Sequence, residues 1–141
     1  MRAWPVLCAV GLACVLVACG GDASDSGGRA DSTAAVVENP NAPGVHQVGP
    51  NQYEVVIQVS EGSYLPSEIH VPVGAEITFR VRSTDIPHGF LIDGAGVKLS
   101  PVPEEYREAT HVFDRVGVYN FHCDEYCGGS HELMKGRIIA E

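Results

Sequence analysis

A short segment near the C-terminus concentrates side chains that could bind a metal, because Cys123, Cys127, His131 and Met134 lie within twelve residues. Soft sulfur ligands together with imidazole favour copper over hard cations, and a methionine beside cysteine and histidine is typical of electron-transfer copper rather than structural zinc. His88, in the upstream motif Ile-Pro-His-Gly-Phe, offers a second imidazole from another part of the chain. These residue types predict a copper site built from two cysteines, two histidines and one methionine.

The same residues allow other readings. Cys123 and Cys127 could form a disulfide in an oxidising compartment, although His131 and Met134 would then have no use. Zinc could be bound by both cysteines, His131 and another histidine, but this leaves Met134 unexplained. A mononuclear blue-copper site is a further alternative, and it would need only one of the two cysteines.

The pattern Cys-x-Glu-x-Cys-x-x-x-His-x-x-Met, with the earlier His-Gly-Phe, resembles the binuclear CuA domain of cytochrome c oxidase subunit II. The similarity extends over about residues 53–141 and is greatest to the compact subunit II of ba3-type oxidases. The resemblance implies specific ligands: Cys123 and Cys127 would bridge two coppers, His88 and Met134 would complete one, and His131 with the backbone carbonyl of Glu125 would complete the other.

The resemblance also implies partners. Electrons would arrive from cytochrome c or another small redox protein and pass to subunit I of a haem-copper oxidase. The Glu125 side chain would bind magnesium only when the domain is docked to a catalytic subunit. The alternative is a free-standing, lipid-anchored copper redox carrier or copper-handling protein without a permanent oxidase partner. No catalysis is expected from this chain alone, because its motifs include no nucleophile with a positioned base and no phosphate-binding glycine loop.

The N-terminus has the pattern of an export signal. Met1 and Arg2 precede an apolar run from Trp4 to Ala18, and this run is shorter than the ~20 residues needed to span a bilayer. The sequence Leu-Val-Ala-Cys ending at Cys19 matches the lipobox of bacterial lipoproteins, in which the cysteine is acylated. We therefore expect a signal peptide at residues 1–18 and an extracytoplasmic protein anchored by lipid to a bacterial membrane, on its periplasmic side or at the cell surface.

Composition divides the rest of the chain into two parts. Residues 19–50 are rich in Gly, Ser, Ala, Asp and Pro without a hydrophobic period, which predicts a flexible linker after the lipidated cysteine. Residues 51–141 are then the copper-binding domain. The formal net charge of −9 disfavours nucleic acid as a partner and would attract a cationic redox protein.

Apolar and polar residues alternate along the proposed domain, which is the pattern of half-buried strands. Glycine and proline punctuate these short segments, and no amphipathic helix is evident. The pattern predicts an all-β fold, and the resemblance makes it a cupredoxin-like Greek-key β-barrel or sandwich with the ligands at one end. The expected strands are residues 53–59, 69–73, 77–81, 88–92, 110–113, 118–121 and 136–140.

Other residues near the motif are assigned by geometry. Strand alternation places His122 on the face opposite Cys123, so we expect that it is not a ligand. His46, in the linker, and His70, on the polar face of a strand, are expected to be solvated, and His111 has no assigned role. Residues expected to form an apolar shell around the metal are Phe90, Leu91, Tyr126 and Leu133.

Overall fold

The structure is a computed structural model that describes residues 39–141, and the expected signal peptide, lipidated Cys19 and first part of the linker lie outside this range. The described chain is almost entirely strands. These are β1 (Gly44–Gly49), β2 (Gln52–Ser60), β3 (Ser63–Leu65), β4 (Glu68–Val71), β5 (Glu76–Ser83), β6 (Phe90–Ile92), β7 (Val97–Leu99), β8 (Arg107–Val112), β9 (Gly117–His122) and β10 (Lys135–Ala140), with a short 3-10 helix, η1 (His131–Leu133), before β10.

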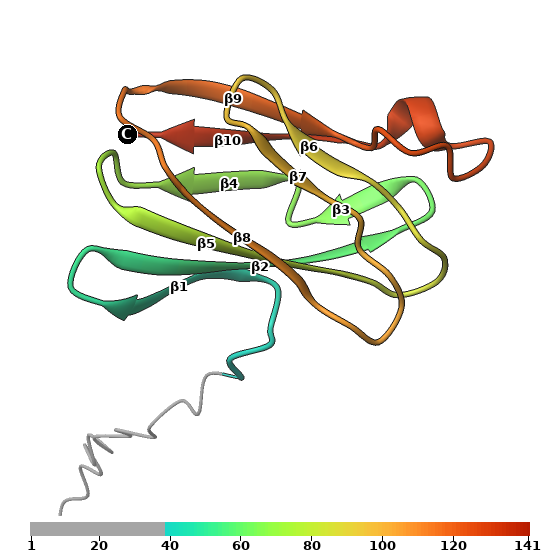
Figure 1. The fold of residues 1–141 in the computed structure, drawn as a ribbon, viewed down its shortest axis with the longest axis horizontal. Coiled ribbons are helices and arrows are strands. Elements are labelled where there is room, and N and C mark those ends of the chain that lie inside the picture. The colour runs from blue at the N-terminus through green and yellow to red at the C-terminus, as the bar shows by residue number, and fades with distance from the viewer. Residues whose placement is uncertain (1–38) are drawn as a thin grey trace, which may run out of the picture. The chain divides into compact units, whose positions relative to one another are not determined.

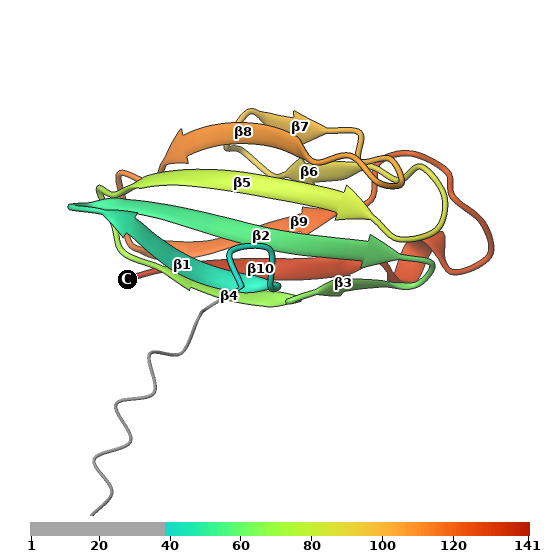
Figure 2. The same cartoon turned by 90° about the horizontal axis from the view of Figure 1, so that it is seen from below.

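The strands form two five-stranded sheets that face each other (Figures 1 and 2). The first has the order β1-β2-β5-β8, with β3 also paired to β2, and the second has the order β4-β10-β9-β6-β7. The pairs β2/β5 and β10/β4 are parallel, whereas the other pairs are antiparallel. The chain therefore crosses repeatedly between sheets, and the predicted all-β sandwich is confirmed.

Alternating side chains explain why these segments are strands. In β5 the buried residues Ile77, Phe79 and Val81 alternate with half-exposed or exposed neighbours, so one face meets the other sheet. β2 lies beside β5 with Val55 opposite Phe79, and its central residues are buried as well. A one-residue slip would turn the apolar side chains outward, which fixes the register of the pair.

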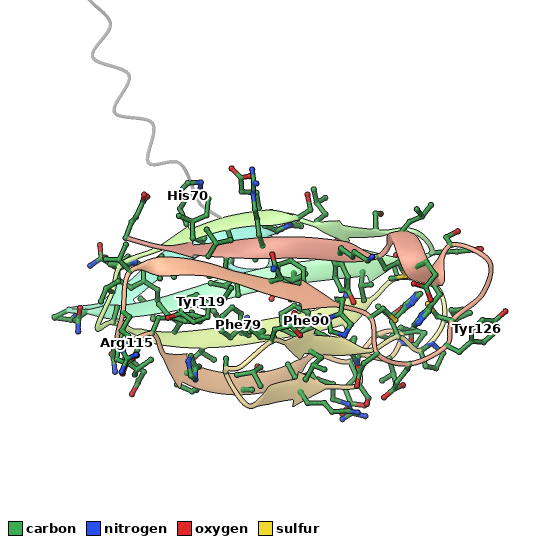
Figure 3. The ribbon with its side chains drawn as sticks, turned by 90° about the horizontal axis from the view of Figure 1, so that it is seen from above. His70, Phe79, Phe90, Arg115, Tyr119 and Tyr126 are labelled. Carbon is green, nitrogen blue, oxygen red and sulfur yellow. The ribbon has the colours of Figure 1, made fainter. Side chains whose placement is uncertain are left out.

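An aromatic cluster fills the space between the sheets. Phe90 lies with its ring centroid 5.1 Å from Phe121, 5.9 Å from Tyr64 and 6.0 Å from Phe79. Figure 3 shows Phe79 and Phe90 in the middle of the sandwich, between strands of the two sheets. Such tilted and edge-on contacts add to the burial of apolar area. The cluster forms a fixed base for the segment that follows β9.

Several elements differ from the sequence-based expectation. The predicted linker extends to residue 50, but Gly44–Gly49 forms β1 and pairs with β2. β1 has exposed Val45 and Val48 on a short edge strand, so its stability comes from the pairing and not from an apolar face. β3, β7 and η1 were not predicted either. The strand expected from His88 begins only at Phe90, because the His88 N–H donates to Pro101 O outside the sheet ladder.

Gly136 in β10 provides a test of the packing. A β-carbon at this position would lie 2.1 Å from Cζ of Phe121 and 2.5 Å from the carbonyl oxygen of Ser67. We expect Gly136→Ala to lower the free energy of unfolding by about 1–3 kcal/mol, because a buried ring and the backbone must both move. Gly117→Ala is the matched control, since its β-carbon would be 3.6 Å from the nearest atom, in Tyr119. Equal denaturation midpoints for the two variants would contradict this account.

Among residues 39–141, no helix is long and apolar enough to cross a lipid bilayer.

Candidate metal centre

The segment between β9 and β10, residues 123–134, forms a loop at the end of the sandwich away from the C-terminus (Figure 1). Cys123 follows β9 directly and Met134 precedes β10, so adjacent antiparallel strands bring the two ends of the loop together. The Cys123 N–H donates to Met134 O at 3.1 Å and closes the loop. The η1 turn is held by the Met134 N–H, which donates to His131 O at 3.1 Å. The sheet therefore fixes both ends of the ligand loop.

The predicted ligand side chains meet at this point. The Sγ atoms of Cys123 and Cys127 are 3.4 Å apart, and the two cysteines are free. Cys127 Sγ lies 3.3 Å from Met134 Sδ and 3.6 Å from His131 Nδ1. One ligating atom each from His88, Cys123 and Cys127 lie within 4.8 Å of one another. All five side chains thus face one small volume beside the core.

The backbone of Glu125 contributes an oxygen to the same volume. The Sγ atom of Cys123 lies 3.0 Å from Glu125 O. The Glu125 carboxylate instead contacts Ser100, from whose hydroxyl it accepts a short hydrogen bond. The carbonyl and the carboxylate of this residue therefore have separate environments.

His88 is held by Asp85, a residue to which the sequence analysis gave no role. The His88 side chain is fully buried, and its Nε2 lies 2.8 Å from Asp85 Oδ1. Its Nδ1 is buried and has no hydrogen-bond partner within the described range 39–141. A buried ring nitrogen without a partner fits a metal ligand, because buried polar atoms are otherwise paired. A histidine whose other nitrogen bonds a carboxylate is a common arrangement at metal sites.

The Asp85 carboxylate is itself fixed by several donors. It accepts hydrogen bonds from the backbone N–H of Glu61 at 2.6 Å and of Ile86 at 2.7 Å, and from the Ser83 hydroxyl at 3.1 Å. Burial by itself raises the pKa of Asp85, but the hydrogen bonds from Glu61, His88, Ile86 and Ser83 outweigh it and lower the pKa to about 2. The carboxylate is thus charged at neutral pH and can orient His88.

Asp85→Asn is expected to weaken copper binding on the order of 10-fold or more, because His88 loses a charged orienting partner. In the copper-free protein, Asp85 has a folded pKa of about 2 against an ordinary value of 3.8. Its contribution to stability is therefore present above about pH 4 and is lost as the pH falls towards 2. Competition with a chelator and denaturation across this pH range measure both effects. Asp93→Asn, at the exposed partner of His122, is the control and should change neither.

In the metal-free protein, the surroundings of Cys127 favour its protonated thiol over the thiolate. Burial first, and then the neighbouring Cys123, raise the pKa of Cys127 to about 11. This thiol therefore carries its proton at neutral pH, and metal binding must displace that proton. The Gly89 N–H donates to Cys123 Sγ at 3.3 Å, while the Tyr64 hydroxyl donates to Gly89 O at 2.5 Å. Burial and the nearby Cys123 sulfur raise the pKa of Tyr64 above its usual range, so this hydroxyl remains a donor.

The remaining histidines lie away from the cluster. His122 is on the opposite face from Cys123 with its Nδ1 3.4 Å from Asp93, so the predicted orientation is confirmed. His70 is exposed and contacts Glu68 and Glu141. His46 Nε2 lies 2.8 Å from Ala42 O, and the His111 ring packs edge-on against Phe113.

The expected apolar shell is only partly correct. Phe90 is fully buried and Leu91 is half-buried, as a shell would require. Tyr126 and Leu133 are instead 85% and 74% exposed. Figure 3 shows Tyr126 on the ligand loop, which projects beyond the ends of the strands. These two residues therefore belong to the surface around the site.

The donor set fits copper. Two thiols, imidazole nitrogens and a thioether are soft or intermediate ligands, and the buried His88 has a ring nitrogen close to both sulfurs and an Nδ1 without a hydrogen-bond partner among the described residues. A disulfide between Cys123 and Cys127 is not formed in this structure.

Similarity to known proteins agrees with this chemistry. Residues 55–140 match the family described as cytochrome C oxidase subunit II, periplasmic domain. The chain is 38% identical over 116 residues to cytochrome c oxidase subunit 2 of Thermus thermophilus, covering 80% of this chain and 86% of the relative. Among solved structures, a heme-copper terminal oxidase dimer has a chain with a TM-score of 0.67, 29% identity and 74% coverage of both chains. The periplasmic domain of cytochrome oxidase subunit II (CoxB) of Bradyrhizobium japonicum has a TM-score of 0.51 at 30% identity, covering 52% of this chain and 54% of that chain.

Fold and site together define a cupredoxin-like copper domain for electron transfer that lies outside the cytoplasm. The chain belongs to the family of cytochrome c oxidase subunit II.

Proposed function

We propose that this domain holds a binuclear CuA centre. Cys123 and Cys127 would hold both copper ions, His88 and Met134 would complete one ion, and His131 with the carbonyl oxygen of Glu125 would complete the other. The observation that carries the proposal is a pair of free, buried thiols whose sulfur atoms are 3.4 Å apart. The side chains of His131, Met134 and His88 converge on these two sulfurs.

Bound copper would supply a one-electron redox couple. The chain supplies a site whose ligands are positioned before the metal arrives: the sheet fixes the loop ends, Asp85 orients His88, and the Gly89 N–H meets the Cys123 sulfur. A preformed, largely buried site limits the rearrangement that accompanies a change of oxidation state. This arrangement suits rapid transfer of single electrons.

We further propose that Tyr126 and Leu133, together with Ile86, form a docking face for the electron donor. These side chains are exposed apolar groups at the ligand end, and the Tyr126 ring lies 5.8 Å from that of His131. Glu61 and Glu132 lie in the same region, in keeping with the negative charge of the chain. An apolar face with acidic neighbours suits a redox protein with a basic rim, such as a cytochrome c.

Reduction of the copper-loaded protein by a reduced cytochrome c tests this face. Rapid mixing should give a second-order rate that falls as ionic strength rises, because opposite charges attract the partners. Tyr126→Ser should lower the second-order rate constant about tenfold, which corresponds to a rise of ~1.4 kcal/mol in the activation free energy. Val116→Ser is the control, since Val116 is 76% exposed and adjoins Arg115 at the other end of the molecule (Figure 3). Equal effects of the two substitutions would contradict the docking face.

The acceptor is proposed to be subunit I of a haem-copper oxidase. The support is family membership and the similarity to a chain of a heme-copper terminal oxidase dimer. In this arrangement the Glu125 carboxylate would leave Ser100 and bind magnesium when the domain is docked. Co-purification with haem tests membership of an oxidase. If this protein is purified without haem from a solubilised membrane preparation in which the oxidase remains active, the free-standing carrier is favoured.

The division of the chain into a signal peptide at residues 1–18, a lipidated Cys19 with a linker, and the copper domain is also proposed. Its support is the lipobox ending at Cys19 and the change of composition that follows. Labelling with a radioactive fatty acid tests it, because Cys19→Ala should remove the label from the protein. Persistent labelling of that variant would exclude this anchor.

A further inference from the structure

The ligand loop has an attachment besides its two ends. Lys98, in the middle of β7, forms an ion pair with Asp124, and its Nζ lies 2.5 Å from Asp124 Oδ2. Asp124 follows Cys123 directly in the chain, so this contact acts on the backbone between the Cys123 sulfur and the Glu125 carbonyl. Leu91 in β6 is paired with Lys98 in β7 on one side and with His122 in β9 on the other. Strand β6 therefore lies between Lys98 and β9. The Lys98 side chain therefore reaches across β6 to the loop.

The two partners differ strongly in exposure. The Lys98 side chain is 59% exposed, whereas that of Asp124 is only 12% exposed. Asp124 Oδ1 is buried and, among residues 39–141, has no hydrogen-bond partner. An exposed ion pair contributes little, but a carboxylate that is nearly buried is costly when it loses its only cationic partner. Lys98 thus has more influence on this loop than an ordinary surface lysine.

Asp124 also lies against the second segment of the site. A β-carbon on Gly89 would be 2.3 Å from Asp124 Oδ1 and 2.7 Å from the Asp124 backbone nitrogen, so the carboxylate and the loop backbone pack directly on Gly89. Gly89 donates its N–H to Cys123 Sγ and follows His88 in the chain. A shift of Asp124 towards solvent would therefore move the loop away from the segment that carries His88.

We propose that Lys98 and Asp124 are a positioning pair that holds the Cys123–Glu125 backbone against Gly89 and so sets the geometry of the copper centre. Neither side chain is among the proposed ligands. The inference rests on the proposed ligands, and it adds a hairpin, β6–β7, to the elements that support the site. The pair acts as a unit, because either residue alone leaves the other without its partner.

The variants that test this are Lys98→Met, Asp124→Asn, the double variant, and Lys98→Arg, which keeps the charge. Lys135→Met is the control: it removes the same charge beside Met134, and within the described structure Lys135 forms no ion pair. The first readout needs no copper and is the hydrogen exchange of the Gly89 and Cys123 amides in the copper-free protein, since these N–H groups donate to Cys123 Sγ and Met134 O. The second readout is the copper hyperfine splitting in the electron paramagnetic resonance spectrum, together with copper loss to a chelator.

We expect Lys98→Met and Asp124→Asn each to speed amide exchange, change the hyperfine splitting in the same direction, and weaken copper binding on the order of tenfold. The double variant should be no worse than either single variant, Lys98→Arg should resemble the unaltered protein, and Lys135→Met should leave exchange and hyperfine splitting unchanged. Losses of copper affinity that add up in the double variant, with unchanged exchange and hyperfine splitting, would show that the two side chains act independently and overturn the proposal. Unchanged behaviour of both single variants would overturn it as well. Failure of the unaltered protein to bind copper would instead refute the proposed function, while the exchange measurement would still decide on the pair.

Discussion

Cys123→Ser is expected to abolish the binuclear centre, and Cys127→Ser should do the same. A serine oxygen is a harder and poorer bridging ligand for copper than a thiolate, and each proposed copper ion needs both sulfurs. The Sγ atoms are 3.4 Å apart in the core of the site, so no other described thiol can replace either one. Copper content should fall from two ions per chain to one or none, and the spectrum of the shared electron should disappear. Metal analysis and electron paramagnetic resonance measure both.

Met134→Leu is the matched comparison for these variants. Met134 is fully buried, and leucine has a similar volume, so the core should tolerate the change at a cost below about 1.5 kcal/mol. Copper should be retained, because the bridging sulfurs remain, while the reduction potential and spectrum change. Full copper loading with an unaltered spectrum in Cys123→Ser would refute the bridging assignment.

Gly89→Ala is expected to have the next largest effect. The added β-carbon would lie 2.3 Å from Asp124 Oδ1, 2.7 Å from Asp124 N and 2.8 Å from Glu125 N. Two of these atoms are backbone of the ligand loop, so relief requires the loop to move away from His88 and Cys123. If relieving this overlap costs ~2 kcal/mol of the free energy of copper binding, the affinity for copper falls by about thirtyfold. Chelator competition measures this loss.

Gly129→Ala provides the control in the same loop. A β-carbon there meets nothing within 4 Å, and this residue does not have the positive φ angle found at Gly128. Copper binding should therefore stay close to that of the unaltered protein. Similar losses in the two variants would mean that any added methyl group in this region disturbs the site, and that the contact at Gly89 is not specific.

The sequence was informative where chemistry and periodicity leave few choices. Cys123, Cys127, His131 and Met134 are close in the chain, so a short loop had to bring them together wherever it lay. The strands with strict alternation, such as β2 and β5, were predicted because one buried face leaves a period of two in the sequence. The orientation of His122 followed from the same rule.

Other features depend on contacts between distant segments and could not be read from local patterns. Asp85 stands three residues before His88, and this spacing is only a weak hint that the two side chains interact. The Asp85 carboxylate also accepts a hydrogen bond from the Glu61 amide, which belongs to another turn. The role of Gly89 follows from its approach to Asp124, which is far away in sequence. β1 is recognisable only through its pairing with β2. Tyr126 was expected in the apolar shell around the metal, yet the outward course of the loop leaves it exposed.

The binuclear centre can be tested by counting the copper ions per chain and the unpaired electrons per copper on one sample, in which the thiols are reduced before copper is loaded and the loaded centre is then kept in its oxidised form. We expect two copper ions per chain that share a single unpaired electron, with hyperfine structure from both copper nuclei. One copper per chain with its own unpaired electron would identify a mononuclear site. Absence of copper uptake after full reduction of both thiols would contradict a copper centre altogether.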